Sequence, residues 1–186
     1  MALGPGELPR PPDWQRGKQR ISQYAADHGD SVDAGAVHAT KSSLFQGALA
    51  DGVRARPGVV DSVRAAREAG WRVALVTTTA RENLDALFDG LGGELTADDF
   101  DVIVDSGSVS EGKPDPAAYE YALETLGEDP AAAVAVEDNV GGVAAARAAG
   151  VSVFAFPNEN TREHDFGAVE TIDVLVPADL GVSFDA

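Results

Sequence analysis

The stretch from Ala132 to Gly150, AAVAVEDNVGGVAAARAAG, contains the most informative local pattern of the chain. A short apolar run ends in two adjacent acids, Glu137 and Asp138, and glycines and an alanine-rich segment follow at once. A short run rich in valine predicts a strand, and the alanine-rich segment predicts a helix that stops at Gly150. The sequence therefore predicts a buried strand with two carboxylates at its carboxyl end and a helix directly after them.

Strands and helices alternate in the same way over most of the chain. The predicted strands are residues 71–79, 100–106, 132–138 and 151–156, with a last edge strand at 171–177. The predicted helices are residues 59–70, 80–92, 115–127 and 140–150, and Pro57 can open the first of these. Such alternation predicts an α/β fold, a parallel sheet with helices on both faces, whose chemistry lies beyond the carboxyl ends of the strands.

Three regions of the chain differ in composition. Residues 1–13 contain four prolines and two glycines, which predict an irregular tail. Residues 14–55 predict a small helical unit without a strand, because apolar side chains recur at helical spacing in two segments. These side chains are Ile21, Tyr24 and Ala25, before a stop at Gly29, and then Val37, Leu44, Phe45 and Leu49. Residues 56–186 form the predicted α/β core.

The balance of charges excludes some classes of partner. The formal net charge is −17 at pH 7, and lysine occurs only at positions 18, 41 and 113. Such a field repels nucleic acid and anionic membrane surfaces, so we expect neither as a partner. An acidic surface with few lysines favours a salt-rich, halophilic cytoplasm, where salt screens self-repulsion; an ordinary acidic protein is the alternative.

The sequence contains no cysteine, so we expect neither disulfides nor thiolate chemistry. No apolar run approaches the roughly 20 residues that cross a bilayer. The first residues also lack the apolar core of a signal peptide. These features predict a cytoplasmic protein.

Polar residues follow two further segments of the predicted core. Thr77, Thr78 and Thr79 end a strand, and their hydroxyl and backbone N–H groups could form an anion cradle at the start of the next helix. The alternative is a turn that caps this helix. Lys113 stands in a rigid turn between a glycine and two prolines, where an ammonium suits charge compensation of a transferring phosphoryl group. A solvated loop lysine is the alternative here.

The adjacent acids Glu137 and Asp138 repel one another, and partial burial at a strand end adds a cost of desolvation. A hard cation such as Mg²⁺, which takes oxygen ligands and keeps several waters, relieves that repulsion. We therefore predict that the pair holds Mg²⁺. The alternative is a carboxylate that caps the next helix while its neighbour faces solvent.

In combination, the order strand–Thr, then Gly-Lys-Pro, then strand–Glu-Asp followed by glycine resembles motifs two, three and four of the haloacid dehalogenase (HAD) superfamily of phosphohydrolases. The resemblance covers nearly the whole chain. It implies that Thr77 binds phosphate through its hydroxyl and Thr78 through its backbone N–H. It also implies that Lys113 orients the nucleophile and the phosphate, and that Glu137 and Asp138 are the metal acids.

The helical unit at 14–55 resembles part of the cap that such enzymes insert after their first strand. The segments GKQRI, HATK, RPGV, TTTARENL, KPDPAAY and TREHDFGA…ADLG most resemble the CbbY-type branch. That branch, close to phosphoglycolate phosphatases, includes xylulose-1,5-bisphosphate phosphatases and neighbours β-phosphoglucomutases. The resemblance implies a small phosphorylated sugar as substrate and Mg²⁺ as cofactor.

The same resemblance implies that Lys18, Arg20 and Lys41 meet the non-reacting phosphate or the sugar from the cap. Cations on this face are where a substrate anion overcomes the field of an acidic protein. For Arg20 a surface position on a helix is the alternative. His38 is interpreted as a packing or solvated residue, and Asn83 either reaches a sugar hydroxyl or is an ordinary residue of a first helical turn.

One motif of the family has no counterpart. Its members contain a strand that ends in Asp-x-Asp-x-Thr, whose first Asp attacks phosphorus and whose second protonates the leaving oxygen. Nothing here matches, since Asp13 follows a proline pair and Asp27 and Asp30 lie in or beside helical segments. We therefore name no nucleophile, and we expect a slot or a distorted sheet between the strands that end at Thr77 and Val136.

Two functions remain open at this point. The first is a Mg²⁺-dependent phosphatase of a small sugar phosphate that has lost its N-terminal strand and is inactive as this chain. The second is a non-catalytic binding module, or half of a split enzyme that another chain completes. A mutase is a third option that no residue here selects.

Overall fold

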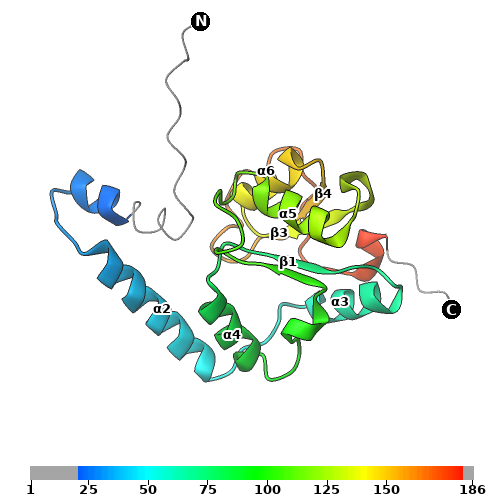
Figure 1. Cartoon of the computed structure of the whole chain (residues 1–186), viewed down its shortest axis with the longest axis horizontal. Coiled ribbons are helices and arrows are strands. Elements are labelled where there is room, and N and C mark those ends of the chain that lie inside the picture. The colour runs from blue at the N-terminus through cyan, green and yellow to red at the C-terminus, as the bar shows by residue number, and fades with distance from the viewer. Residues whose placement is uncertain (1–20, 182–186) are drawn as a thin grey trace, which may run out of the picture.

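Two pairs of parallel strands lie at the centre of the computed structural model, which describes residues 21–181 (Figure 1). β1 (Ala74–Val76) pairs with β2 (Val102–Val104), and β3 (Val134–Glu137) pairs with β4 (Ser152–Ala155). Because the two strands of each pair are parallel, their carboxyl ends meet at one edge. This edge carries the polar residues that the sequence places after the strands.

Helices cover both sides of these strands. In Figure 1, α3 (Val59–Glu68) and α4 (Arg81–Gly90) lie on one side, and α5 (Ala117–Leu126) and α6 (Val140–Ala148) lie on the other. Three short 3₁₀ helices, η1, η2 and η3, lie at Ala97–Asp99, Pro130–Ala132 and Pro177–Leu180. The predicted α/β class is confirmed. Between residues 21 and 181, no helix combines the length and the hydropathy that a membrane span requires.

The sheet is interrupted between β1 and β3. Within the described residues the strands form two separate two-stranded sheets, and no ladder joins one pair to the other. The residues of β1 are all partly exposed, whereas an inner strand of a parallel sheet is normally buried on both faces. Within residues 21–181 this interruption agrees with the predicted slot or distorted sheet, while the predicted loss of a first strand stays a prediction.

Small side chains allow the helices to approach the strands closely. Ala145 of α6 is fully buried in one apolar cluster with Ala135 of β3. Ala118 of α5 lies in a second cluster with Val104 of β2, which is also fully buried. Val76 of β1 packs against both clusters, so this one side chain connects the apolar cores of the two strand pairs.

The predicted edge strand at residues 171–177 is wrong. Thr171 makes a single parallel bridge with Ala155, and no strand follows it. The buried apolar side chains of this segment are Ile172 and Leu175, which are three residues apart. A strand buries every second residue on one face, so this spacing requires the chain to turn instead.

α3 begins two residues after Pro57 and not at the proline itself. Gly58, the residue between them, has a φ angle of 82°. A Cβ at this position would overlap the carbonyl group of Leu175. Glycine therefore suits both the positive φ angle and the close approach to Leu175. Helical backbone needs negative φ, and α3 therefore starts at Val59.

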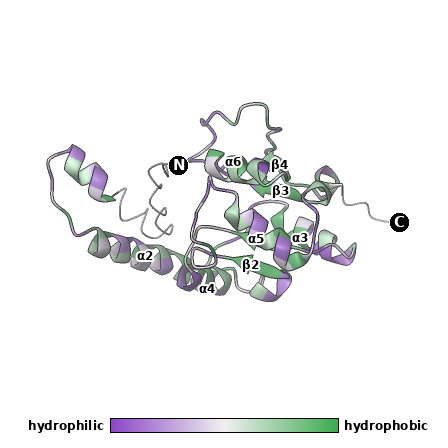
Figure 2. Cartoon of the chain, turned by 45° about the horizontal axis from the view of Figure 1, so that its top comes forward, coloured by the Kyte–Doolittle hydropathy of each residue, from purple (hydrophilic) through white to green (hydrophobic). Residues whose placement is uncertain are grey.

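The described part of the predicted helical unit consists of residues 21–27 and α2 (Ala34–Ala50). Both helices extend away from the core in Figures 1 and 2. Gly29 follows the first helix with a φ angle of 74°, as its predicted role as a stop requires. Asp33 caps α2, because its side chain accepts hydrogen bonds from two backbone N–H groups of the first turn.

α2 packs on the core where its end meets the end of α4. Leu49 is buried there, whereas the other three members of the predicted apolar stripe are exposed, namely Val37, Leu44 and Phe45. The Gly90 carbonyl at the end of α4 accepts a hydrogen bond of 2.9 Å from the Val53 N–H. A Cβ on Gly90 would lie 2.7 Å from the Leu49 carbonyl oxygen, so the two helix ends touch through backbone atoms.

We predict that Gly90→Ala lowers the free energy of unfolding by about 1–3 kcal/mol, because the new methyl group can be placed only by shifting α2. Gly47→Ala is the control. A Cβ at Gly47 has open space, and alanine favours a helix over glycine by about 0.5–1 kcal/mol. Urea unfolding of both variants measures the difference, and equal stabilities would contradict the close packing of α2 on α4.

Candidate functional site

Lys113 links the carboxyl ends of β1 and β3. Its side chain is 9% exposed, and its ammonium donates a hydrogen bond of 2.8 Å to the carbonyl oxygen of Val76, the last residue of β1. The same ammonium forms an ion pair with Oε1 of Glu137, the last residue of β3. One cation therefore joins two strands that share no ladder.

The Glu137 carboxylate is buried and enclosed by two helices. Its Oε1 accepts a hydrogen bond from the Tyr119 hydroxyl of α5 as well as from Lys113, whose ammonium lies 5.1 Å from the centre of the Tyr119 ring. Its Oε2 lies against Gly142 in the first turn of α6, where a Cβ would overlap it. The carboxylate thus has a fixed position between α5 and α6.

Tyr119 ends the KPDPAAY segment, but the sequence analysis assigns it no role in this cluster. Burial raises the pKa of its hydroxyl, and the negative charge of Glu137 and the hydrogen bond to it raise this pKa further. The hydroxyl therefore stays protonated and acts as a donor. A signal for it was present, since Tyr119, Ala122 and Leu123 recur at helical spacing on the buried face of α5, where a polar atom needs a partner.

Asp138 lies just after β3 and is partly exposed. Its Oδ1 accepts a hydrogen bond from Nδ2 of Asn139, and its Oδ2 accepts one from Nδ2 of Asn158, both of 2.8 Å. Asn139 also caps α6, because its side-chain oxygen accepts from the Gly142 N–H. The alternative in which an acid caps this helix is therefore wrong.

The two predicted metal acids differ in their surroundings. Within residues 21–181, no group of three or more Asp, Glu, His or Cys side chains is arranged to hold a metal ion. Oε1 of Glu137 is engaged by Lys113 and Tyr119, whereas each oxygen of Asp138 accepts one amide and keeps a further lone pair. Mg²⁺ is commonly bound by one or two carboxylates with substrate phosphate and water, so Asp138 fits as a direct ligand.

Thr77, Thr78 and Thr79 form the turn that follows β1. The Thr77 N–H donates a hydrogen bond of 2.8 Å to the Val104 carbonyl and extends the ladder with β2. The Thr77 hydroxyl accepts from the Thr79 N–H at 3.1 Å and stabilises the turn. The N-cap residue of α4 is Ala80, so the triplet lies ahead of the helix and does not cap it.

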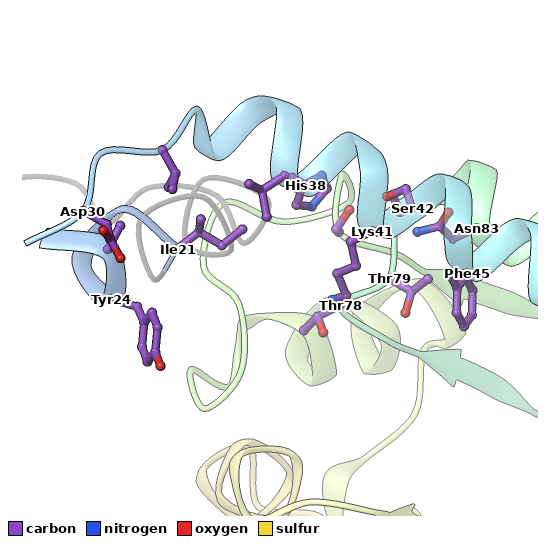
Figure 3. A pocket seen from close by; sticks show the side chains of 15 residues that line it. Ile21, Tyr24, Asp30, His38, Lys41, Ser42, Phe45, Thr78, Thr79 and Asn83 are labelled. Atoms are coloured by element: carbon purple, nitrogen blue, oxygen red, sulfur yellow. The ribbon is translucent and has the colours of Figure 1, made fainter. Parts of the chain in front are cut away.

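A cavity of about 750 Å³ lies between α2 and this turn (Figure 3). Its polar lining residues are Asp30, His38, Lys41 and Ser42 from the helical segment and Thr78, Thr79, Asn83 and Ser106 from the core, with Tyr24 at its edge. In Figure 3 the Lys41 side chain points from α2 toward Thr78. Lys41 is the single lysine or arginine among the described residues that line this cavity.

Asn83 connects the two walls of the cavity. Its side-chain oxygen accepts a hydrogen bond of 2.8 Å from Nε2 of Gln46, so α4 and α2 are joined beside the cavity as well as at their ends. Lys18 and Arg20, which were expected to act together with Lys41, lie outside the described residues.

The structure thus divides the predicted residues into two adjoining groups. Thr78 and Lys41 line the cavity, while Lys113, Glu137 and Asp138 gather at the ends of the strands. The two groups are close along the chain, because the Val76 carbonyl that binds Lys113 precedes Thr78 by two residues.

An α/β core with these polar residues at its strand ends defines a class of hydrolase. The chain belongs to the haloacid dehalogenase-like hydrolase family, which it matches over residues 10–150.

Within this family, the chain is similar to CbbY proteins and to a phosphoglycolate phosphatase. The chain is 37% identical over 158 residues to protein CbbY of Rhodobacter capsulatus, which is 83% of this chain and 70% of that protein. A crystal structure of a CbbY mutant from Rhodobacter sphaeroides in complex with xylulose-(1,5)bisphosphate is 33% identical, with a TM-score of 0.76 over 85% of this chain and 72% of that one. Phosphoglycolate phosphatase of Thiobacillus denitrificans is 28% identical over 175 residues, 93% of this chain and 67% of that protein.

We predict that Tyr119→Phe lowers the free energy of unfolding by about 1–3 kcal/mol near neutral pH, because the buried Glu137 carboxylate loses a donor. Tyr121→Phe is the control on the same helix, since this side chain is 42% exposed and the change should stay within about 0.5 kcal/mol. Chemical denaturation of both variants measures the two losses. Equal losses would show that the Tyr119 hydroxyl does not support Glu137.

The contribution of the Tyr119 hydroxyl should also depend on pH. Because its pKa is raised in the folded protein, its stabilising effect is present below the ordinary tyrosine pKa of about 10 and is lost as the pH rises beyond it. Above that pH the unfolded chain ionises while the folded chain does not. The difference in melting temperature between the wild-type protein and Tyr119→Phe should therefore narrow above about pH 10, and a constant difference would contradict this account.

Gly142→Ala is expected to cost about 1–3 kcal/mol of unfolding free energy, because the new methyl group displaces Glu137 from Lys113 and Tyr119. Gly141→Ala is the matched control on the same turn of α6. The nearest atom to a Cβ at Gly141 is the side-chain oxygen of Asn139 at 3.2 Å, and a side chain can adjust by a few tenths of an ångström. Thermal unfolding separates the two, and a harmless Gly142→Ala would disprove the enclosed position of Glu137.

Proposed function

We propose that this protein is a Mg²⁺-dependent phosphatase for a small phosphorylated sugar similar to xylulose bisphosphate. The observation that carries the proposal is the position of the Lys113 ammonium, which lies between the ends of β1 and β3, close along the chain to the cavity wall at Thr78. A fixed and largely buried ammonium at such a place stabilises the negative charge of a transferring phosphoryl group.

Each predicted residue has a role in this proposal. Lys113 and the backbone N–H of Thr78 would hold the reacting phosphate, and Glu137 would keep Lys113 in position. Asp138 would bind Mg²⁺, which supplies neutralising charge beside the phosphate when it is bound. The Thr77 hydroxyl would either contact the phosphate or keep the turn in shape for Thr78, as it does through Thr79.

A substrate with two phosphates suits a chain with two separate cations at its site. Lys41 lines the cavity from α2, while Lys113 lies at the strand ends of the core. The related CbbY structure contains xylulose bisphosphate, which supports a sugar of this kind. Residues 14–55 would then serve as a partial cap, from which Lys18 and Arg20 would join Lys41 at the second phosphate.

We assign no attacking carboxylate, because no segment of this sequence matches the Asp-x-Asp-x-Thr motif of the family. We therefore propose that this chain alone binds its substrate and Mg²⁺ without turnover. No ladder of backbone hydrogen bonds joins β1 to β3. This favours half of a split enzyme as the second candidate, in which another chain supplies a strand between them.

Ligand binding is tested by thermal unfolding in the presence of Mg²⁺ and xylulose-1,5-bisphosphate. A ligand at about 100 times its Kd stabilises the native state by about 2.7 kcal/mol, which corresponds to a rise in Tm of about 5–10 °C for a chain of this size. We expect Lys41→Met to reduce this rise by at least half, because the second phosphate loses the one proposed cation that lines the cavity within the described residues. No rise at saturating ligand would count against both candidate functions.

Arg72→Met is the control for Lys41→Met, since it removes one positive charge from an exposed ion pair with Glu128 at 3.7 Å. This surface pair contributes little to stability. We expect the ligand-dependent rise in Tm to be the same for Arg72→Met and the wild-type protein. Equal effects of the two variants would show that net charge, and not the cavity, determines binding.

A further inference from the structure

Arg56 connects the segment between α2 and α3 to the loop that follows β4. Its two terminal nitrogens donate hydrogen bonds of 2.7 Å to consecutive carbonyl oxygens, those of Phe156 and Pro157. The centre of its guanidinium also lies 3.4 Å from the centre of the Phe156 ring. Arginine suits this place because its planar fork reaches two acceptors at once while it stacks on an aromatic ring.

The segment that carries Arg56 is itself held on the core. The Val53 N–H donates to the Gly90 carbonyl, and the Ala55 N–H donates to Oε2 of Glu94, each at 2.9 Å. Arg56 is therefore presented from a fixed backbone. Because Arg56 donates to the Phe156 and Pro157 carbonyls, the position of the loop depends on the position of this segment.

The next residue of that loop, Asn158, reaches Asp138. Its Nδ2 donates a hydrogen bond of 2.8 Å to Oδ2 of Asp138, and its own backbone N–H donates to Oγ1 of Thr161 at 2.9 Å. The other oxygen of Asp138 is held by Asn139, which is fixed as the cap of α6. The Asn139 amide therefore depends on α6 for its position, and the Asn158 amide depends on the loop to which Arg56 is hydrogen-bonded.

Electrostatics agree with this arrangement. Burial lowers the pKa of Arg56, while the negative charge of Asp138 acts in the opposite direction. The guanidinium remains charged in any case, because arginine has the highest pKa of the side chains. The opposite charges of Arg56 and Asp138 attract each other, which favours a loop conformation in which the Asn158 amide meets Asp138.

We propose that Asn158 is a positioning residue for Asp138 and that Arg56 acts through Asn158. The proposal rests on the proposed function, because that function assigns Mg²⁺ to Asp138. A group that orients a metal ligand through a hydrogen bond commonly changes metal affinity by about 10- to 100-fold. Arg56 would thereby make the acid end of the site depend on the segment that leads from the helical unit into the core.

The experiment measures the Kd of Mg²⁺ by isothermal titration calorimetry on the full chain, together with Tm, for Asn158→Ala and Arg56→Lys. We expect each variant to bind Mg²⁺ about 10-fold more weakly or worse. Asn160→Ala is the matched control, because it makes the same change two residues away on an exposed side chain. Its Kd should equal that of the wild-type protein within a factor of two.

The double variant Arg56→Lys/Asn158→Ala tests whether the two residues act in series. If Arg56 acts through Asn158, the double variant binds Mg²⁺ no more weakly than Asn158→Ala alone. Losses that multiply would overturn the serial part of the proposal. Variants that lower Tm but leave the Kd within a factor of two would overturn the whole proposal, because a merely structural anchor predicts that pattern.

Failure of the proposed function gives a different pattern, in which the wild-type protein itself shows no binding of Mg²⁺. The positioning role is then tested by the position of Asp138 in crystal structures of the wild-type protein and Arg56→Lys. An unmoved Asp138 carboxylate in Arg56→Lys would overturn the proposal that Arg56 positions Asp138 through Asn158. A rotated carboxylate that has lost its contact with Asn158 would support it without any metal.

Discussion

The ion pair between Lys113 and Glu137 is the contact on which the arrangement of the core depends most. β1 and β3 share no ladder, so the usual backbone hydrogen bonds do not fix one strand pair relative to the other. Lys113 replaces some of them, because its ammonium binds the end of β1 and the end of β3 together. A buried charge is stable only when its partners are well placed, and the Tyr119 hydroxyl gives the Glu137 carboxylate a donor in addition to Lys113.

The adjacent acids show how a strand end can separate two chemical tasks. Successive side chains along an extended backbone point to opposite sides, so Glu137 and Asp138 cannot share one environment. Glu137 turns into the core and neutralises Lys113, while Asp138 meets the amides of Asn139 and Asn158. The expected repulsion between the pair is therefore relieved by protein groups on both sides, and a metal ion would add to this relief.

Much of the fold follows from local sequence signals. The valine-rich run before Glu137 and the alanines after it predict β3 and α6, and parallel pairing then brings the strand ends together without further information. The partners within the site are a different matter. That Tyr119 meets Glu137, or that Asn158 meets Asp138, depends on how α5 and the loop after β4 are turned, which residues distant in sequence decide. The failed edge strand has the same cause, since burial of Ile172 and Leu175 against the core overrides the local preference for a strand.

The distribution of lysine follows from the same electrostatic constraint. An acidic protein with a net charge of −17 attracts an anion only where local cations reverse the field. The chain has three lysines, and the two within the described residues lie at the cavity and at the strand ends. Ion pairs on the exposed surface are made by arginines instead, as at Arg54 and Arg72. Under the proposed function, a phosphate would meet net repulsion away from these two lysines, and the lysines would both attract it and bind it.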